Sequence, residues 1–196
     1  GLTGQVANVV TASRGLTGNF VYRPQIRTVR TPARLTNGEA SISGAVGGTE
    51  FTLSARNNSF RNGNAGLEIV TTPAGAIIDR RDEELFVNGE DARIGGTIRR
   101  SFGNGSILNA NAAFGIFHNN VGEDSLRSAP NQPDRIRTLR EREREHNYEL
   151  GGDYEFGLGG GRLKLIGLHR FEHSPFRQTL IQTFANDLPT QGERFT

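Results

Sequence analysis

Apolar and polar side chains alternate with a period of two along much of this chain, and this period restricts its possible folds more than any other feature. Within Glu39–Val46, for example, Ala40 and Ile42 alternate with Ser41 and Ser43. Because successive side chains of a β-strand point to opposite faces, each such segment predicts a strand with one apolar face and one polar face. The same alternation runs through Asn19–Arg27, Phe51–Arg56, Asp91–Arg99, Leu108–Ile116 and Asn147–Phe156.

The connections between these segments are alternately short and long. The short ones are built from glycine, at 47–48, 103–105 and 159–161, and the long polar ones cover 27–35, 57–90 and 118–145. In an up-and-down meander, alternate connections lie at the same end of the sheet. The sequence therefore predicts an all-β, antiparallel up-and-down meander with every tight turn at one end, an asymmetry typical of bacterial outer-membrane barrels.

The composition excludes several other classes of protein. The 23 basic and 21 acidic residues leave a net charge of +2, which is too small for a nucleic-acid partner. The chain has no cysteine, so it forms no disulfide, thiolate zinc site or cysteine nucleophile. No apolar run approaches the roughly 20 residues of a membrane-spanning helix. We expect no cofactor and no enzymatic activity.

The start and the length of the chain lead to two further expectations. There is no methionine, and the first residue is Gly1, so we expect that residues upstream have been removed. The length of 196 residues suits a single structural unit.

Alternation by itself fits two architectures, a transmembrane barrel and a soluble antiparallel β-sandwich that acts as a binding module. The predicted apolar face contains many alanines and glycines, which fill a sandwich core poorly but are acceptable against lipid. This favours the barrel. Aromatic residues near the predicted strand ends are candidates for the membrane-interface girdles of such a barrel: Phe20, Tyr22, Phe102, Tyr148, Tyr154 and Phe156.

Two parts of the chain resemble the TonB-dependent receptor family of Gram-negative outer membranes. The segment Gly1–Thr11 resembles the closing strand of that family's plug domain, and Gly151–Phe156 with Arg162–Gly167 resembles one of its barrel hairpins. The resemblance implies that residues 1–14 are the end of the plug and residues 15–196 the N-terminal part of the barrel, with Gly15–Arg27 as the first wall strand.

The resemblance also implies a function. The complete protein would be an outer-membrane transporter of about 22 strands that takes up a scarce ligand, such as an iron–siderophore chelate or another small nutrient. Its partners would be outer-membrane lipid and a TonB-type energy-coupling protein, contacted through an N-terminal segment that this chain does not contain. The soluble sandwich remains the alternative.

One charged motif is a candidate ligand site. Residues 140–145 alternate arginine and glutamate, so an extended chain would place Arg140, Arg142 and Arg144 on one face and the glutamates on the other. We interpret the motif either as a solvated loop flank above the membrane or as an arginine row that faces an anionic or chelated ligand. Two further motifs suggest no site. His169 and His173 lie about 13 Å apart on a strand, too far to share a metal, and the acidic pairs have no partnered base.

Overall fold

A computed structural model describes residues 15–26, 32–184 and 191–195 of the chain. The segment expected to close the plug, residues 1–14, lies outside the described residues. Within these described residues, nine antiparallel strands form a single sheet: β1 (Thr17–Tyr22), β2 (Gly38–Val46), β3 (Thr49–Thr71), β4 (Ile77–Ser101), β5 (Ile107–Ser128), β6 (Arg135–Leu158), β7 (Gly161–His173), β8 (Phe176–Phe184) and β9 (Gln191–Phe195).

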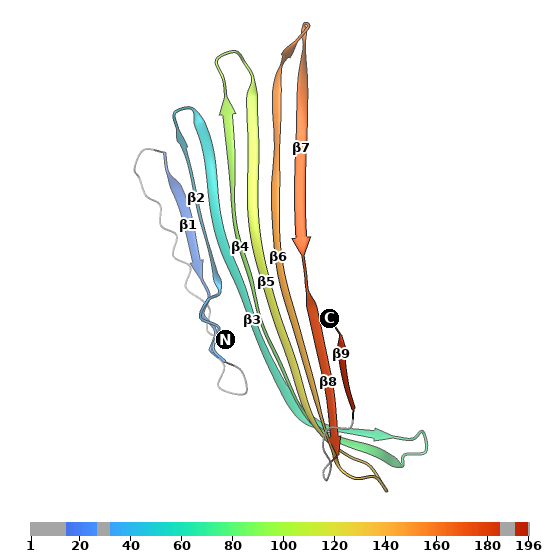
Figure 1. The fold of residues 1–196 in the computed structure, drawn as a ribbon. Coiled ribbons are helices and arrows are strands. Elements are labelled where there is room, and N and C mark those ends of the chain that lie inside the picture. The colour runs from blue at the N-terminus through green and yellow to red at the C-terminus, as the bar shows by residue number, and fades with distance from the viewer. Residues whose placement is uncertain (1–14, 27–31, 185–190, 196) are drawn as a thin grey trace.

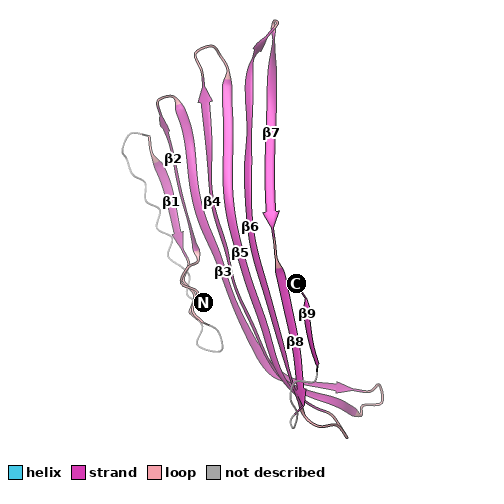
Figure 2. Ribbon diagram, in the orientation of Figure 1, coloured by secondary structure: helices cyan, strands magenta, loops and turns pink. Residues whose placement is uncertain are grey.

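The strands follow one another in chain order across the sheet, as the meander prediction required (Figure 1). The sheet is open within the described residues, because β1 forms one edge, β7 and β9 lie along the other, and neither of these two pairs with β1. Strands and loops make up the described part, without a helix or a second layer (Figure 2). The second layer that a β-sandwich requires is therefore missing from this part of the chain, and the all-β meander prediction is confirmed.

Tight glycine turns gather at one end of the sheet. Gly47 and Gly48 join β2 to β3 with φ angles of 58° and 79°, and Gly159 and Gly160 join β6 to β7 with 56° and 83°. Positive φ at both central residues is the geometry of a type I′ turn, which matches the twist of paired strands. The β4–β5 turn lies at the same end (Figure 1). The prediction that every tight turn lies at this end was wrong, because the β3–β4 turn at 72–76 has the same two backbone hydrogen bonds as the β4–β5 turn and lies at the opposite end.

The two later long connections do not exist as loops. β3 and β4 continue through residues 57–90 and leave only the turn 72–76, while β5 and β6 continue through 118–145 and leave only 129–134. The prediction was wrong because both faces of these strands become polar in this half of the sheet, so the period of two disappears from the sequence although the strands continue.

β7 and β8 are two parts of one strand. Both pair with β6, and the register on either side of the break is the same, with His173 opposite His146 and Phe176 opposite Glu143. Pro175 interrupts the strand because it has no backbone N–H, but its carbonyl oxygen still accepts a hydrogen bond from the Arg144 amide at 3.1 Å. β6 thus keeps one register with β7 and β8 along its length.

Candidate functional site

One face of the sheet carries an apolar band that crosses every strand from β1 to β7. Paired residues of neighbouring strands lie on the same face, so the register connects rows of side chains across the sheet. One row contains almost only apolar side chains and runs through Phe20, Ala40, Ala55, Ile94, Phe114, Tyr148 and Phe171. The rows nearer the tight turns on this face are of similar character.

The band is exposed rather than buried. Leu53, Ile94 and Leu150 keep 53%, 59% and 51% of their surface exposed, and Val21, at 9% exposed, is the one buried large hydrophobic residue of the described part. Monomeric proteins in water rarely expose a continuous apolar surface of this kind. Covering the exposed half of a leucine or isoleucine contributes about 1 kcal/mol, so the band is stable only against an apolar medium or another apolar surface.

Aromatic side chains gather at two levels of the band. Near the tight turns, Phe102 meets Tyr154 edge to face at 6.3 Å, and Tyr154 stacks on Phe156 at 5.5 Å. At the other level, Tyr148 stacks on Phe171 at 5.3 Å. The nine residues from Tyr148 to Phe156 match the 9 to 11 residues with which a tilted strand crosses a bilayer.

All six aromatic residues that the sequence marked as interface candidates lie on the apolar face. Phe20 belongs to the same row as Tyr148, and Tyr22 follows it at the charged edge of the band, where its hydroxyl donates a hydrogen bond to the Leu35 carbonyl oxygen at 2.8 Å. Phe102, Tyr154 and Phe156 form the level near the tight turns. Contact of these residues with a membrane stays a prediction.

The opposite face is mainly polar over the same stretch of strand, with Ile166 and Leu168 of β7 as exposed apolar exceptions. A shallow hollow of about 510 Å³ lies on it, and Thr52, Arg99 and Asn109 are among the side chains that line it. Asp153 at its edge accepts a hydrogen bond from the side-chain amide of Asn109 at 2.9 Å and forms an ion pair with Lys164 at 3.2 Å. The polar groups of this face therefore satisfy one another in a manner that suits contact with water.

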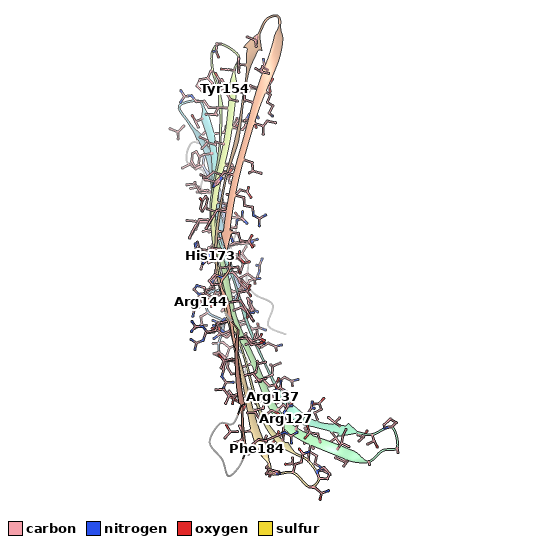
Figure 3. The ribbon with its side chains drawn as sticks, turned by 45° about the vertical axis from the view of Figure 1, so that its right-hand side comes forward. Arg127, Arg137, Arg144, Tyr154, His173 and Phe184 are labelled. Atoms are coloured by element: carbon pink, nitrogen blue, oxygen red, sulfur yellow. The ribbon has the colours of Figure 1, made fainter. Side chains whose placement is uncertain are left out.

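Towards the far end, the polar face holds a buried ion network of Asp79, Arg81, Glu83, Glu123, Arg127 and Arg135. Asp79 pairs with Arg81 at 2.9 Å and with Arg135 at 3.0 Å, and Arg127 pairs with Glu83 at 3.2 Å. Asp79 and Arg127 are each only 7% exposed. Figure 3 shows the labelled Arg127 on the side towards which the β3–β4 tip bends, so the network lies in the concave angle of the bend.

The network holds the pKa of the Asp79 carboxyl below its ordinary value of 3.8. Burial acts to raise this pKa, but the hydrogen bond from Arg81 and the charges of Arg135, Arg81 and Arg127 outweigh it. A carboxyl with a depressed folded-state pKa stabilises the fold above its ordinary pKa and loses this effect as the pH falls through the folded-state value. We therefore expect the ion network to hold β4, β5 and β6 together at neutral pH. Below pH 3.8 this stabilisation should be lost progressively, and the far end of these strands should unfold locally more often.

Amide hydrogen exchange at several pH values checks this expectation. The protection factors of residues 79–83 and 123–127 should fall as the pH is lowered below 3.8, while those of 108–116 and 148–156 change less. The variant Asp79→Asn should show low protection in the first two segments already at neutral pH, because it leaves Arg135 without its partner. Unchanged protection in the variant would contradict a stabilising role for the network.

The candidate arginine row lies on a strand, not in a loop. Arg140, Arg142 and Arg144 belong to β6, and their side chains alternate with those of the three glutamates, as an extended chain requires. The placement in a loop was wrong for the reason given above, since both faces of β6 are polar there. Arg140 pairs with Asp124 at 2.7 Å and lies 5.4 Å from the centre of the Phe86 ring.

The arginine row shares its face with the apolar band. Arg144 precedes Tyr148 by four residues on β6, or about 13 Å towards the far end. Its guanidinium lies 3.4 Å from the Nδ1 atom of His118 on β5. Binding of a ligand by the three arginines stays a prediction, but the face they occupy is the apolar one.

The histidines lie on the strand predicted for them. His169 and His173 are both on β7, where His169 contacts the Tyr148 hydroxyl at 3.2 Å and His173 contacts the ring of His146 at 5.2 Å between centroids. Each histidine therefore has a different neighbour. His146, His118 and Arg177 gave no signal in the sequence, because only the register between β5, β6, β7 and β8 brings them beside the arginine row.

Comparison with protein families, curated proteins and solved structures gave no match. Within the described residues, no helix is both long and apolar enough to cross a membrane.

Proposed function

We propose that the sheet is part of the wall of an outer-membrane transporter of the TonB-dependent type, with its apolar face towards lipid and its polar face towards a water-filled lumen. The observation that carries the proposal is the exposed apolar band, which crosses seven strands and has no protein layer over it in the described residues. Lipid would cover this band without the close packing that a protein core needs, which suits its many alanines and glycines.

Two further features support the lipid assignment. The band is bounded by two levels of aromatic side chains, at Tyr148 and at Tyr154. Outer-membrane barrels carry aromatic girdles at both interfaces and tight turns on the periplasmic side. The tight turns at 47–48 and 159–160 would therefore be periplasmic, and the far end with the bent β3–β4 tip would be extracellular.

The long strands suit a large transporter wall. β4 has 25 residues, which span roughly 80 Å, whereas 9 to 11 tilted residues already cross the bilayer. The remainder of each long strand would rise above the membrane on the ligand side. The transported ligand would be a scarce small molecule such as an iron chelate, and a TonB-type protein would supply the energy.

Folding in lipid is the first test of the proposal. We expect the full chain to give a β-sheet circular dichroism spectrum in phosphatidylcholine vesicles or in detergent micelles, and to aggregate when denaturant is removed in plain buffer. The physical reason is the exposed band, whose solvation in water is unfavourable. A folded, monodisperse chain in buffer without detergent would contradict the proposal.

The transporter assignment has a separate test in the gene. The coding sequence that flanks the codons for Gly1 and Thr196 should encode a plug domain upstream and further alternating strands downstream. A gene in which neither flank encodes such segments would contradict a TonB-dependent transporter, even for a chain that folds in lipid.

A further inference from the structure

A belt of basic side chains lies on the apolar face, directly beyond the band. It consists of Arg142, Arg144, His118, His146, His173 and Arg177. The belt belongs to three successive rows of the register, the first of which holds His146 and His173 and adjoins the row of Tyr148 and Phe171. The basic side chains of the belt therefore begin in the row next to the last row of the apolar band.

The arginines of the belt have no acidic partner within the described part of the chain. Arg142 and Arg177 are direct register partners on β6 and β8, and like charges placed opposite each other destabilise a sheet. Neither residue nor Arg144 takes part in an ion pair there, and all three are exposed. An anion between them would remove this repulsion.

Two acids of the same face are already occupied, and Asp82 and Glu84 lie further towards the far end than the belt rows. Glu90, in the row of His118, is held by Arg61 at 2.5 Å, and Asp124 is held by Arg140 at 2.7 Å. The glutamates next to the arginines, such as Glu143, lie on the opposite face because of the alternation along β6. The positive charge of the belt is therefore not neutralised from within the described structure.

A shallow apolar hollow of about 560 Å³ lies in the band below the belt. Ile94, Phe114, Tyr148 and Leu150 line it, and small residues such as Gly96 and Ala112 form its floor. Tyr148 is four residues from Arg144 on the same strand, or about 13 Å. A molecule with an anionic head and an acyl chain would place the head in the belt and the chain in the hollow.

We propose that this belt binds the phosphorylated headgroup of a membrane lipid, with the lipid's acyl chain in the apolar hollow beneath it. Arginine suits this role because its planar guanidinium donates two parallel hydrogen bonds to a phosphate. The proposal rests on the proposed function, since it requires the apolar face to contact lipid. It assigns Arg142 and Arg144 of the arginine row to lipid and not to a transported ligand in the lumen.

The test uses the full chain folded in phosphatidylcholine vesicles that contain a trace of spin-labelled lipid. The measured quantity is the association of spin-labelled phosphatidic acid with the protein relative to that of spin-labelled phosphatidylcholine. We expect a preference of at least about five-fold for phosphatidic acid, since one basic residue near a charged headgroup already supplies about this factor.

Two triple variants locate the preference. Arg142→Gln, Arg144→Gln and Arg177→Gln together should reduce the ratio to about one, because the free cations of the belt are then lost. The control Arg56→Gln, Arg93→Gln and Arg99→Gln changes the net charge equally, but on the polar face, and should keep the wild-type ratio. Equal ratios in the two triple variants would overturn the assignment.

Inorganic phosphate separates a lipid from a free anion. If the protein holds the lipid by headgroup and acyl chain together, millimolar phosphate in the buffer should leave the preference for phosphatidic acid unchanged. If phosphate abolishes this preference, the belt is a site for free anions and the lipid proposal is wrong. If the wild-type chain inserts into the vesicles but associates equally with phosphatidic acid and phosphatidylcholine, lipid binding by the belt is contradicted and the wall assignment is not. A chain that does not enter neutral vesicles at all would overturn the wall assignment and, with it, the belt.

Discussion

A charged side chain introduced at the centre of the apolar band should destabilise the folded chain in a bilayer by about 2 to 4 kcal/mol, the cost of arginine at the midplane of a transmembrane barrel. Leu53→Arg and Leu150→Arg are the variants of choice, since both side chains are about half exposed on the band and lie in the same row of the register. Urea unfolding in vesicles, followed by circular dichroism, measures the change in free energy.

The control for this prediction lies one residue away. Thr52→Arg places the same charge on the opposite, polar face of β3, beside the hollow lined by Arg99 and Asn109. There the guanidinium meets water, and we expect a change within about 0.5 kcal/mol. Equal destabilisation by Leu53→Arg and Thr52→Arg would contradict the assignment of the two faces.

Two glycine substitutions should change stability in opposite directions. Phe86 lies over Gly122, and a Cβ atom added to Gly122 would come within 2.1 Å of the ring, so Gly122→Ala forces the ring and the Arg140 guanidinium beside it to move. Overpacking of this kind costs about 1 to 3 kcal/mol. Both residues lie beyond the band, so the effect does not depend on lipid.

Gly66→Ala is the matched control on β3. No atom lies within 4 Å of an added Cβ there, so the substitution removes only conformational freedom of the unfolded chain and should stabilise by about 0.4 to 1 kcal/mol. The urea midpoints of the two variants should therefore move to opposite sides of the wild-type midpoint. A stabilising Gly122→Ala would contradict the close packing of Phe86 on β5.

The band, the meander and the tight-turn end were predictable from the sequence for one physical reason. Where one face of a strand is apolar and the other is polar, the period of two is visible, as in Glu39–Val46 and Leu108–Ile116. The turns at 47–48 and 159–160 were visible because two successive positive φ angles strongly favour glycine.

The far half of the sheet was not predictable in the same way. Its strands have polar side chains on both faces, as at Arg142 and Glu143, so nothing in the sequence separates a long strand from a loop. The ion network also depends on register, because Asp79 and Arg135 are 56 residues apart in the chain. The belt was found only in part, since Arg177 reaches Arg142 through the pairing of β8 with β6.

Accessibility of single labels on the two faces tests the central claim most directly, and the absence of native cysteine makes the labelling specific. A nitroxide is attached to Ile94→Cys on the apolar face or to Arg93→Cys on the polar face of β4, with the chain folded in phosphatidylcholine vesicles. We expect oxygen, which concentrates in lipid, to relax the label at residue 94, and a water-soluble nickel chelate to relax the label at residue 93. Greater accessibility of residue 94 to the nickel chelate, or equal accessibility of both positions, would contradict a wall with its apolar face in lipid.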